Sequence, residues 1–123
     1  MVKFSNLQIS AIIKAGGVLS AIDGKIDNSE AAVMAATMFG FVGSNESEYK
    51  SIMSSVESMN PDVMLSILSS MNEEQKKFVC GFLSTIIIAD GKIDDSEIRM
   101  WRVFTTLARL PQMSIQEAIK YFE

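Results

Sequence analysis

Hydrophobic side chains recur at every third or fourth position along most of the chain, and regular alternation of polar and apolar residues is nearly absent. The first spacing keeps apolar side chains on one face of an α-helix, whereas a half-buried strand needs a period of two. The pattern therefore predicts an all-α protein, a compact single-domain bundle of about seven helices. We expect these helices at about residues 6–22, 28–40, 46–58, 61–71, 73–89, 95–109 and 114–122.

Several of the expected helices begin with residues that satisfy the free backbone N–H groups of a first turn. In a capping box, the N-cap side chain and the side chain three residues later each accept a hydrogen bond from the other's backbone N–H. Two pairs have this spacing, Asn72 with Gln75 and Ser114 with Glu117. Asn60 followed by Pro61 is another start, because proline fits the first helical position.

The expected core lies along the apolar faces of these helices. Trp101, Phe104 and Ala108 follow helical spacing, so we expect all three inside. Cys80 lies on a strongly apolar helix, and we interpret it as a buried, inert thiol rather than a reactive one. We interpret the pair Gly16–Gly17, within the first helix, as a close approach of a neighbouring helix rather than as a hinge.

A chain of 123 residues with 48% hydrophobic content is long enough to bury its own core, and we treat residues 1–123 as one domain. Its longest apolar stretch, residues 78–89, is far shorter than the roughly 20 residues that span a bilayer. Cleavage of a signal peptide near Ala21 would remove most of the first helix, which argues against such a peptide. We therefore predict a soluble, cytoplasmic protein with no direct membrane insertion.

The chain contains no histidine and a single cysteine, which excludes several kinds of site. Imidazole bases, Ser-His-Asp and Cys-His nucleophiles, His-containing zinc sites and an intramolecular disulfide are all excluded. A formal net charge of −4 argues against nucleic-acid binding, which normally needs a basic surplus. The sequence has no phosphate-binding loop, dinucleotide fingerprint or nucleophile motif. We therefore expect neither an enzyme with catalytic residues nor an organic cofactor.

The acidic charge is concentrated in two nearly identical octapeptides. Residues 23–30 read Asp-Gly-Lys-Ile-Asp-Asn-Ser-Glu, and residues 90–97 read Asp-Gly-Lys-Ile-Asp-Asp-Ser-Glu. Their formal charges are −2 and −3, so the other 107 residues together carry +1. The octapeptides start 67 residues apart, and each lies between two apolar helical segments. This arrangement predicts an internal duplication, with halves at roughly residues 1–60 and 61–123.

Helix ends account for most of each octapeptide. The glycine supplies the left-handed residue after one helix, and the next aspartate and the glutamate fit a capping box of the following helix. Asp23 and Asp90 are left over, because a carboxylate at a helix C-terminus faces the negative end of the dipole, at a cost of ~0.3–1 kcal/mol. A cation shared among the carboxylates would compensate for this cost, and Lys25 or Lys92 would do so more modestly.

Each octapeptide also has the spacing of the second half of an EF-hand calcium loop. The first half is missing, because apolar residues fill the two earlier ligand positions in both copies, and a standard EF-hand is therefore excluded. A weak site for a hard cation, Ca²⁺, Mg²⁺ or Mn²⁺, remains, and helix capping without any ligand is the alternative. The candidate ligands are Asp23, Asp27, Glu30, Asp90, Asp94 and Glu97.

The segments Ile22–Glu30 and Ala89–Glu97, each between apolar helices, resemble those of the TerB-like family of bacterial tellurite-resistance proteins. The resemblance implies a compact all-helical domain of duplicated units in a stress or metal-resistance setting. It also implies divalent cation binding by the same six carboxylates. Neither tellurite resistance itself nor co-chaperone activity follows, because a small domain of this kind is reused in many settings.

Three functions remain as hypotheses. The first is a non-enzymatic, TerB-like interaction domain with a protein partner, whose acidic octapeptides bind divalent cations weakly. The second is a metal-free interaction module that docks a basic partner through its acidic face. The third and least favoured is a metal-assisted hydrolase, because its two metals would need to lie ~3.5–4 Å apart beside a substrate cleft.

Overall fold

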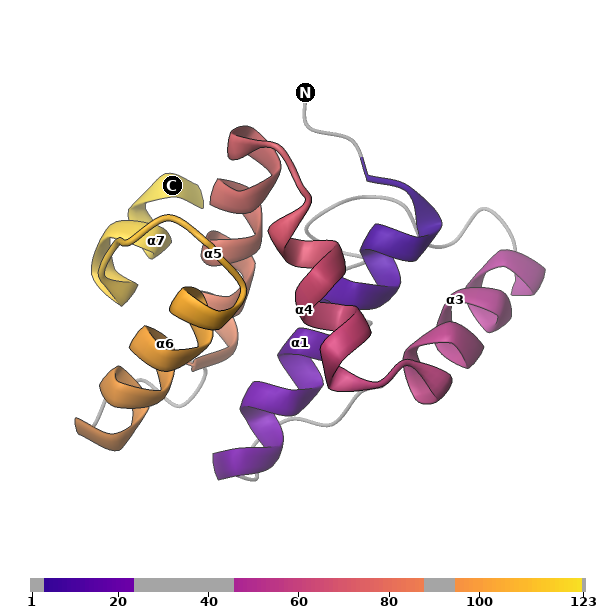
Figure 1. Ribbon diagram of the computed structural model, residues 1–123, viewed down its shortest axis with the longest axis horizontal. Helices are drawn as coiled ribbons and strands as arrows, with labels where there is room; N and C mark the ends of the chain where they lie inside the picture. The colour runs from indigo at the N-terminus through magenta and orange to yellow at the C-terminus, as the bar shows by residue number, and fades with distance from the viewer. Residues whose placement is uncertain (1–3, 24–45, 88–94, 123) are drawn as a thin grey trace.

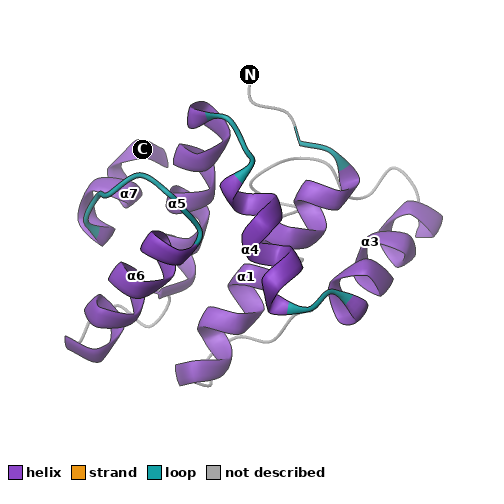
Figure 2. Cartoon of the chain, viewed as in Figure 1, coloured by secondary structure: helices purple, strands orange, loops and turns teal. Residues whose placement is uncertain are grey.

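The computed structural model describes residues 4–23, 46–87 and 95–122, which form a bundle of helices around one hydrophobic core (Figure 1). The helices are α1 (Asn6–Asp23), α3 (Glu46–Ser58), α4 (Pro61–Ser69), α5 (Glu73–Ile87), α6 (Asp95–Leu107) and α7 (Ile115–Phe122). No strand occurs in these three ranges (Figure 2). The predicted all-α class is therefore confirmed, with six helices in the described residues. The further helix expected at residues 28–40 lies outside them.

The helix starts follow the capping residues in the sequence. Asn60 accepts a hydrogen bond through its side chain from the backbone N–H three residues later, at 2.9 Å. Asn72 and Gln75 form the predicted capping box, with bonds of 2.8 and 3.0 Å. Ser114 and Glu117 form the second one, with bonds of 3.1 and 3.3 Å. All three predicted starts are confirmed.

The end of α6 differs from the expectation, because the helix stops at Leu107 rather than at residue 109. Arg109 has a φ of 55°, in the left-handed region that glycine usually fills. The N–H of Leu110 donates to the carbonyl of Thr105 at 2.8 Å, and the N–H of Arg109 donates to that of Thr106 at 3.2 Å. These two bonds form a Schellman motif, which ends a helix. No glycine marks this end in the sequence, so the apolar pattern extended the helix too far.

Helices α1 and α5 lie at the centre of the bundle. α1 packs against α3, α4 and α5, while α5 packs most extensively against α7. Trp101, Phe104, Ala108 and Cys80 are all buried, as predicted. Both residues of Gly16–Gly17 are buried within an unbroken α1, which supports close helix packing over a hinge. Among the helices of the described ranges, none has the length and apolar character needed to cross a membrane.

The two central helices correspond under the same 67-residue offset that separates the octapeptides. α1 and α5 begin 67 residues apart. Ser5 and Gln8 form a capping box at the start of α1, with bonds of 2.9 and 3.1 Å, which matches the one that Asn72 and Gln75 form at the start of α5. The packed pair of α1 with α3 likewise corresponds in chain order to that of α5 with α7. These correspondences support an internal duplication.

Candidate functional site

The acidic octapeptides adjoin helix ends that lie at one end of the bundle. Gln75 Nε2 donates a hydrogen bond to Gln8 Oε1 at 3.3 Å, which joins the N-terminal ends of α5 and α1. Both helices run from there toward the opposite end, where Asp23 ends α1 and Ile87 ends α5 (Figure 1). α6 begins at this same end, with Asp95. We call the region of these two helix ends and this helix start the acidic end.

The structure places two of the six predicted cation ligands. Asp23 is the last residue of α1, and this helix has no basic residue in its last turn. Glu97 lies in the first turn of α6. The others, Asp27, Glu30, Asp90 and Asp94, lie outside the described residues. Among the side chains that the structure describes, no group of three or more aspartates, glutamates or cysteines is placed to hold a metal ion.

Glu97 is buried at the start of α6, with 4% of its surface exposed. It is the third residue of its helix, the position that Gln8, Gln75 and Glu117 occupy in the three capping boxes. A carboxylate in the first turn also interacts favourably with the positive end of the helix dipole. The position of Glu97 therefore supports its predicted part in capping, whereas the neighbouring Asp95 is exposed to solvent.

An apolar groove of about 340 Å³ lies between the C-terminal half of α1 and α6. Among the described residues, Val18 and Leu19 line it from α1, and Met100, Val103 and Leu107 line it from α6. Val103 and Leu107 expose 60% and 59% of their surface, unlike the buried apolar residues of the core. The sequence analysis missed this groove. The available signal was the four-residue spacing of Val103 and Leu107 on a helix face that carries no core residue.

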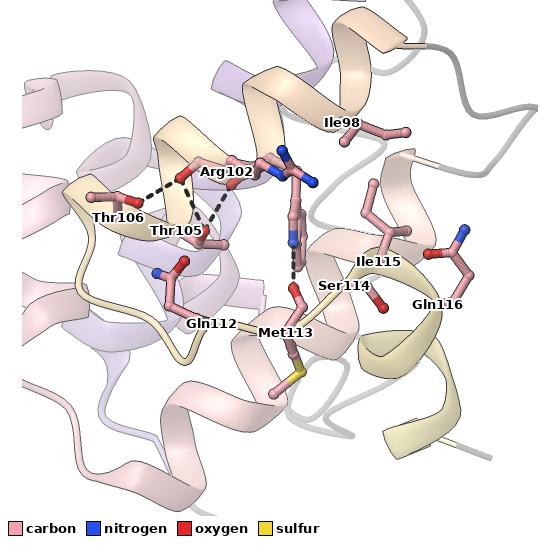
Figure 3. Close-up of a pocket in the computed structure, with 10 residues that line it drawn as sticks. Ile98, Arg102, Thr105, Thr106, Gln112, Met113, Ser114, Ile115 and Gln116 are labelled. Carbon is pink, nitrogen blue, oxygen red and sulfur yellow. Dashed lines mark hydrogen bonds between the residues drawn. The ribbon is translucent and has the colours of Figure 1, made fainter.

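A second cavity, of about 570 Å³, lies between α6 and the segment that leads into α7 (Figure 3). Trp101 forms part of its wall and donates a hydrogen bond from Nε1 to the carbonyl of Met113 at 2.8 Å. Ile98 and Ile115 add apolar surface, and Arg102 is the one charged side chain among the described residues of the wall. The bond from Trp101 ties α6 to the chain just before α7, so the wall is held in place from both sides.

No family model and no curated protein matches the sequence. Among solved structures, the chain is similar to the crystal structure of PG1108, a protein of unknown function from Porphyromonas gingivalis W83. The two chains are 33% identical and superpose with a TM-score of 0.78, over 99% of this chain and 92% of that one. The chain belongs to the same family as PG1108. Because the match to PG1108 covers nearly the whole of both chains, it supports a compact helical domain as the shared fold.

Proposed function

We propose that the protein is a non-enzymatic, TerB-like interaction domain whose acidic end binds Ca²⁺, Mg²⁺ or Mn²⁺ weakly, in a stress or metal-resistance setting. The position of Asp23 carries this proposal, because it is the last residue of α1 in a final turn without a basic residue. A carboxylate there faces the negative end of the helix dipole, an unfavourable contact of ~0.3–1 kcal/mol. A bound cation would offset this repulsion.

The convergence of helix ends supports the same proposal. α1 and α5 both end at the acidic end, and α6 starts there, so both octapeptides adjoin one region of the surface. Carboxylate oxygens without nitrogen or thiolate ligands favour hard cations. The TerB-like resemblance of the two segments leads to the same ions. The proposed ligands are Asp23, Asp27, Glu30, Asp90, Asp94 and Glu97.

Cation-dependent stability tests the proposal. A ligand that binds only the folded protein raises the free energy of unfolding by about 1.4 kcal/mol at ten times its dissociation constant. We expect CaCl₂ or MnCl₂ at about 10 mM to raise the urea midpoint above its value in EDTA at matched ionic strength, if the dissociation constant is about 1 mM. The double variant Asp23→Asn/Asp90→Asn should lose most of this increase.

Asp62→Asn is the matched control for that experiment. Asp62 is an exposed carboxylate in the first turn of α4, so it lies on a helix that does not adjoin an octapeptide. This variant should keep the whole cation-dependent increase in the urea midpoint. No increase in the wild type, or an equal increase in the wild type and the double variant, would contradict the proposed site.

The apolar groove favours a second candidate function, a metal-free module that docks a basic partner at the acidic end. Val103 and Leu107 expose apolar surface on α6, the helix that starts at this end, and such patches mark protein-binding surfaces. Attraction between the acidic end and a basic partner would speed association and make it sensitive to salt. Capture of the partner should then weaken in salt and in the Asp23→Asn/Asp90→Asn variant, and should not respond to EDTA. Capture abolished by EDTA would favour the cation instead.

A further inference from the structure

The cavity between α6 and the start of α7 has the size of a small-molecule site. Its volume of about 570 Å³ lies within the ~300–1,000 Å³ that is usual for ligand pockets. Such pockets combine apolar walls with a few polar groups that orient the ligand. None of the proposed cation ligands is among the described residues that line this cavity, so it is a separate feature from the acidic end.

The apolar part of the wall suits an aliphatic group. Trp101 and Ile115 expose only 2% and 3% of their surface and are firmly packed, while Ile98 and Met113 are half-buried. The Nε1–H of Trp101 is already bonded to the carbonyl of Met113, so the indole offers a ligand its apolar ring rather than a free donor. Transfer of an aliphatic chain from water to this wall is favourable by about 0.8 kcal/mol per fully buried CH₂ group.

Most polar groups around the cavity already have partners within the protein. The hydroxyls of Thr105 and Thr106 donate to backbone carbonyls of α6 at 2.9 and 2.8 Å. Ser114 and Glu117 are bonded to each other in their capping box, which places a carboxylate at the N-terminal end of α7. That end is therefore no strong attraction for a second anion. The anchor for a charged ligand has to come from elsewhere in the wall.

Arg102 supplies that anchor. The side chain is exposed, and Figure 3 places its guanidinium on the side of the cavity where Ile98 and Ile115 lie. Among the described residues of the wall there is no acidic side chain to compete for it. A guanidinium stays charged at neutral pH and holds a carboxylate by two parallel N–H···O bonds. We infer that this cavity binds a small carboxylate with an aliphatic body, whose head group pairs with Arg102 and whose body lies against Trp101.

The fluorescence of Trp101 tests this inference, because Trp101 is the only tryptophan in the chain. Hexanoate, hexanol and hexylammonium have the same aliphatic body and differ in the charge of the head group. We expect hexanoate to change the Trp101 emission to saturation, with a dissociation constant of about 1 mM. Hexanol should bind about tenfold more weakly, and hexylammonium more weakly still, since Arg102 repels it.

Two arginine variants provide the matched comparison. Arg102→Gln should weaken hexanoate binding about tenfold and leave hexanol binding unchanged. Arg99→Gln should bind hexanoate as the wild type does, because Arg99 is an exposed arginine of the same helix that lines the other groove. Three outcomes would each overturn the inference: no saturable change up to about 20 mM hexanoate, equal affinity for the three head groups, or equal losses in the two variants.

Discussion

The side chain of Gln75 donates a hydrogen bond from Nε2 to Oε1 of Gln8 across 3.3 Å, although 67 residues separate the two glutamines. Each is the third residue of its helix, and the Oε1 of each accepts a hydrogen bond from the backbone N–H of its own N-cap residue. The bond therefore joins corresponding positions of two corresponding helices. Because α1 and α5 run the same way from this contact, their C-terminal ends both reach the acidic end (Figure 1).

Substitution of these glutamines should reveal their coupling. Gln75→Ala removes a capping-box bond and the bond to Gln8, so we expect the free energy of unfolding to fall by about 1–2 kcal/mol. A double-mutant cycle with Gln8→Ala should give a coupling of about 0.5 kcal/mol or more by urea denaturation. Gln116→Ala, at an exposed glutamine in the first turn of α7, is the control and should cost little. Purely additive losses would mean that the two side chains do not interact.

Arg109 holds a backbone conformation that glycine adopts at lower energy. Its φ of 55° completes the Schellman motif at the end of α6. We expect Arg109→Gly to raise the free energy of unfolding by about 0.5–1 kcal/mol, because glycine has no Cβ to clash there. Arg109→Ala controls for the loss of charge and should bring no such gain. A lower stability of the glycine variant, measured by urea denaturation, would argue against this helix end.

The thiol of Cys80 links folding stability to alkaline pH. Burial raises its pKa from 9.0 to about 12, and the charge of Glu73 adds to the shift. Above pH 9 the unfolded chain releases the thiol proton while the folded protein retains it, so stability from this group is present below pH 9 and lost as pH rises toward 12. The stability advantage of the wild type over Cys80→Ala should therefore shrink by about 2 kcal/mol between pH 8 and about 10.5. A constant difference between the two proteins over this range would contradict the shift.

Glu97 separates helix capping from cation binding. Glutamine fills the corresponding third position in α1 and α5, so we expect Glu97→Gln to change the free energy of unfolding by less than about 0.5 kcal/mol. Glu97→Ala should cost about 1–2 kcal/mol, since the side chain is buried and its capping bond would be lost. The same urea measurements in EDTA and in CaCl₂ show whether the cation-dependent increase survives in Glu97→Gln. Its complete loss would make Glu97 a principal ligand rather than a cap.

Local signals in the sequence predicted the helices well. The all-α class and the starts at Asn60, Asn72 and Ser114 depend on contacts within a few residues, which a sequence displays directly. The burial of Trp101 followed from helical spacing alone. The end of α6 was wrong by two residues, because an arginine occupies the position where glycine normally marks a helix end.

Features that depend on the packing of distant helices could not be predicted. The octapeptide repeat gave the 67-residue offset, but not the parallel course of α1 and α5 that the Gln8–Gln75 contact reflects. The apolar groove needs α6 to lie beside α1, and the cavity needs the bond from Trp101 to Met113. Neither arrangement leaves a pattern within one helix. For the candidate cation site, the sequence supplied the residue types, and the structure adds that Asp23 ends α1 and that Glu97 is buried.

The most direct test of cation binding at the acidic end is an NMR titration that follows the backbone amides of Gly24 and Gly91, the glycines of the two octapeptides. Ca²⁺ is added up to about 10 mM at constant ionic strength, and Mn²⁺ is used at lower concentration for its paramagnetic broadening. We predict saturable shifts of both amides with Ca²⁺, selective broadening with Mn²⁺, and loss of both effects in Asp23→Asn/Asp90→Asn. Amides that remain unchanged in the wild type over the whole titration would contradict cation binding at this end.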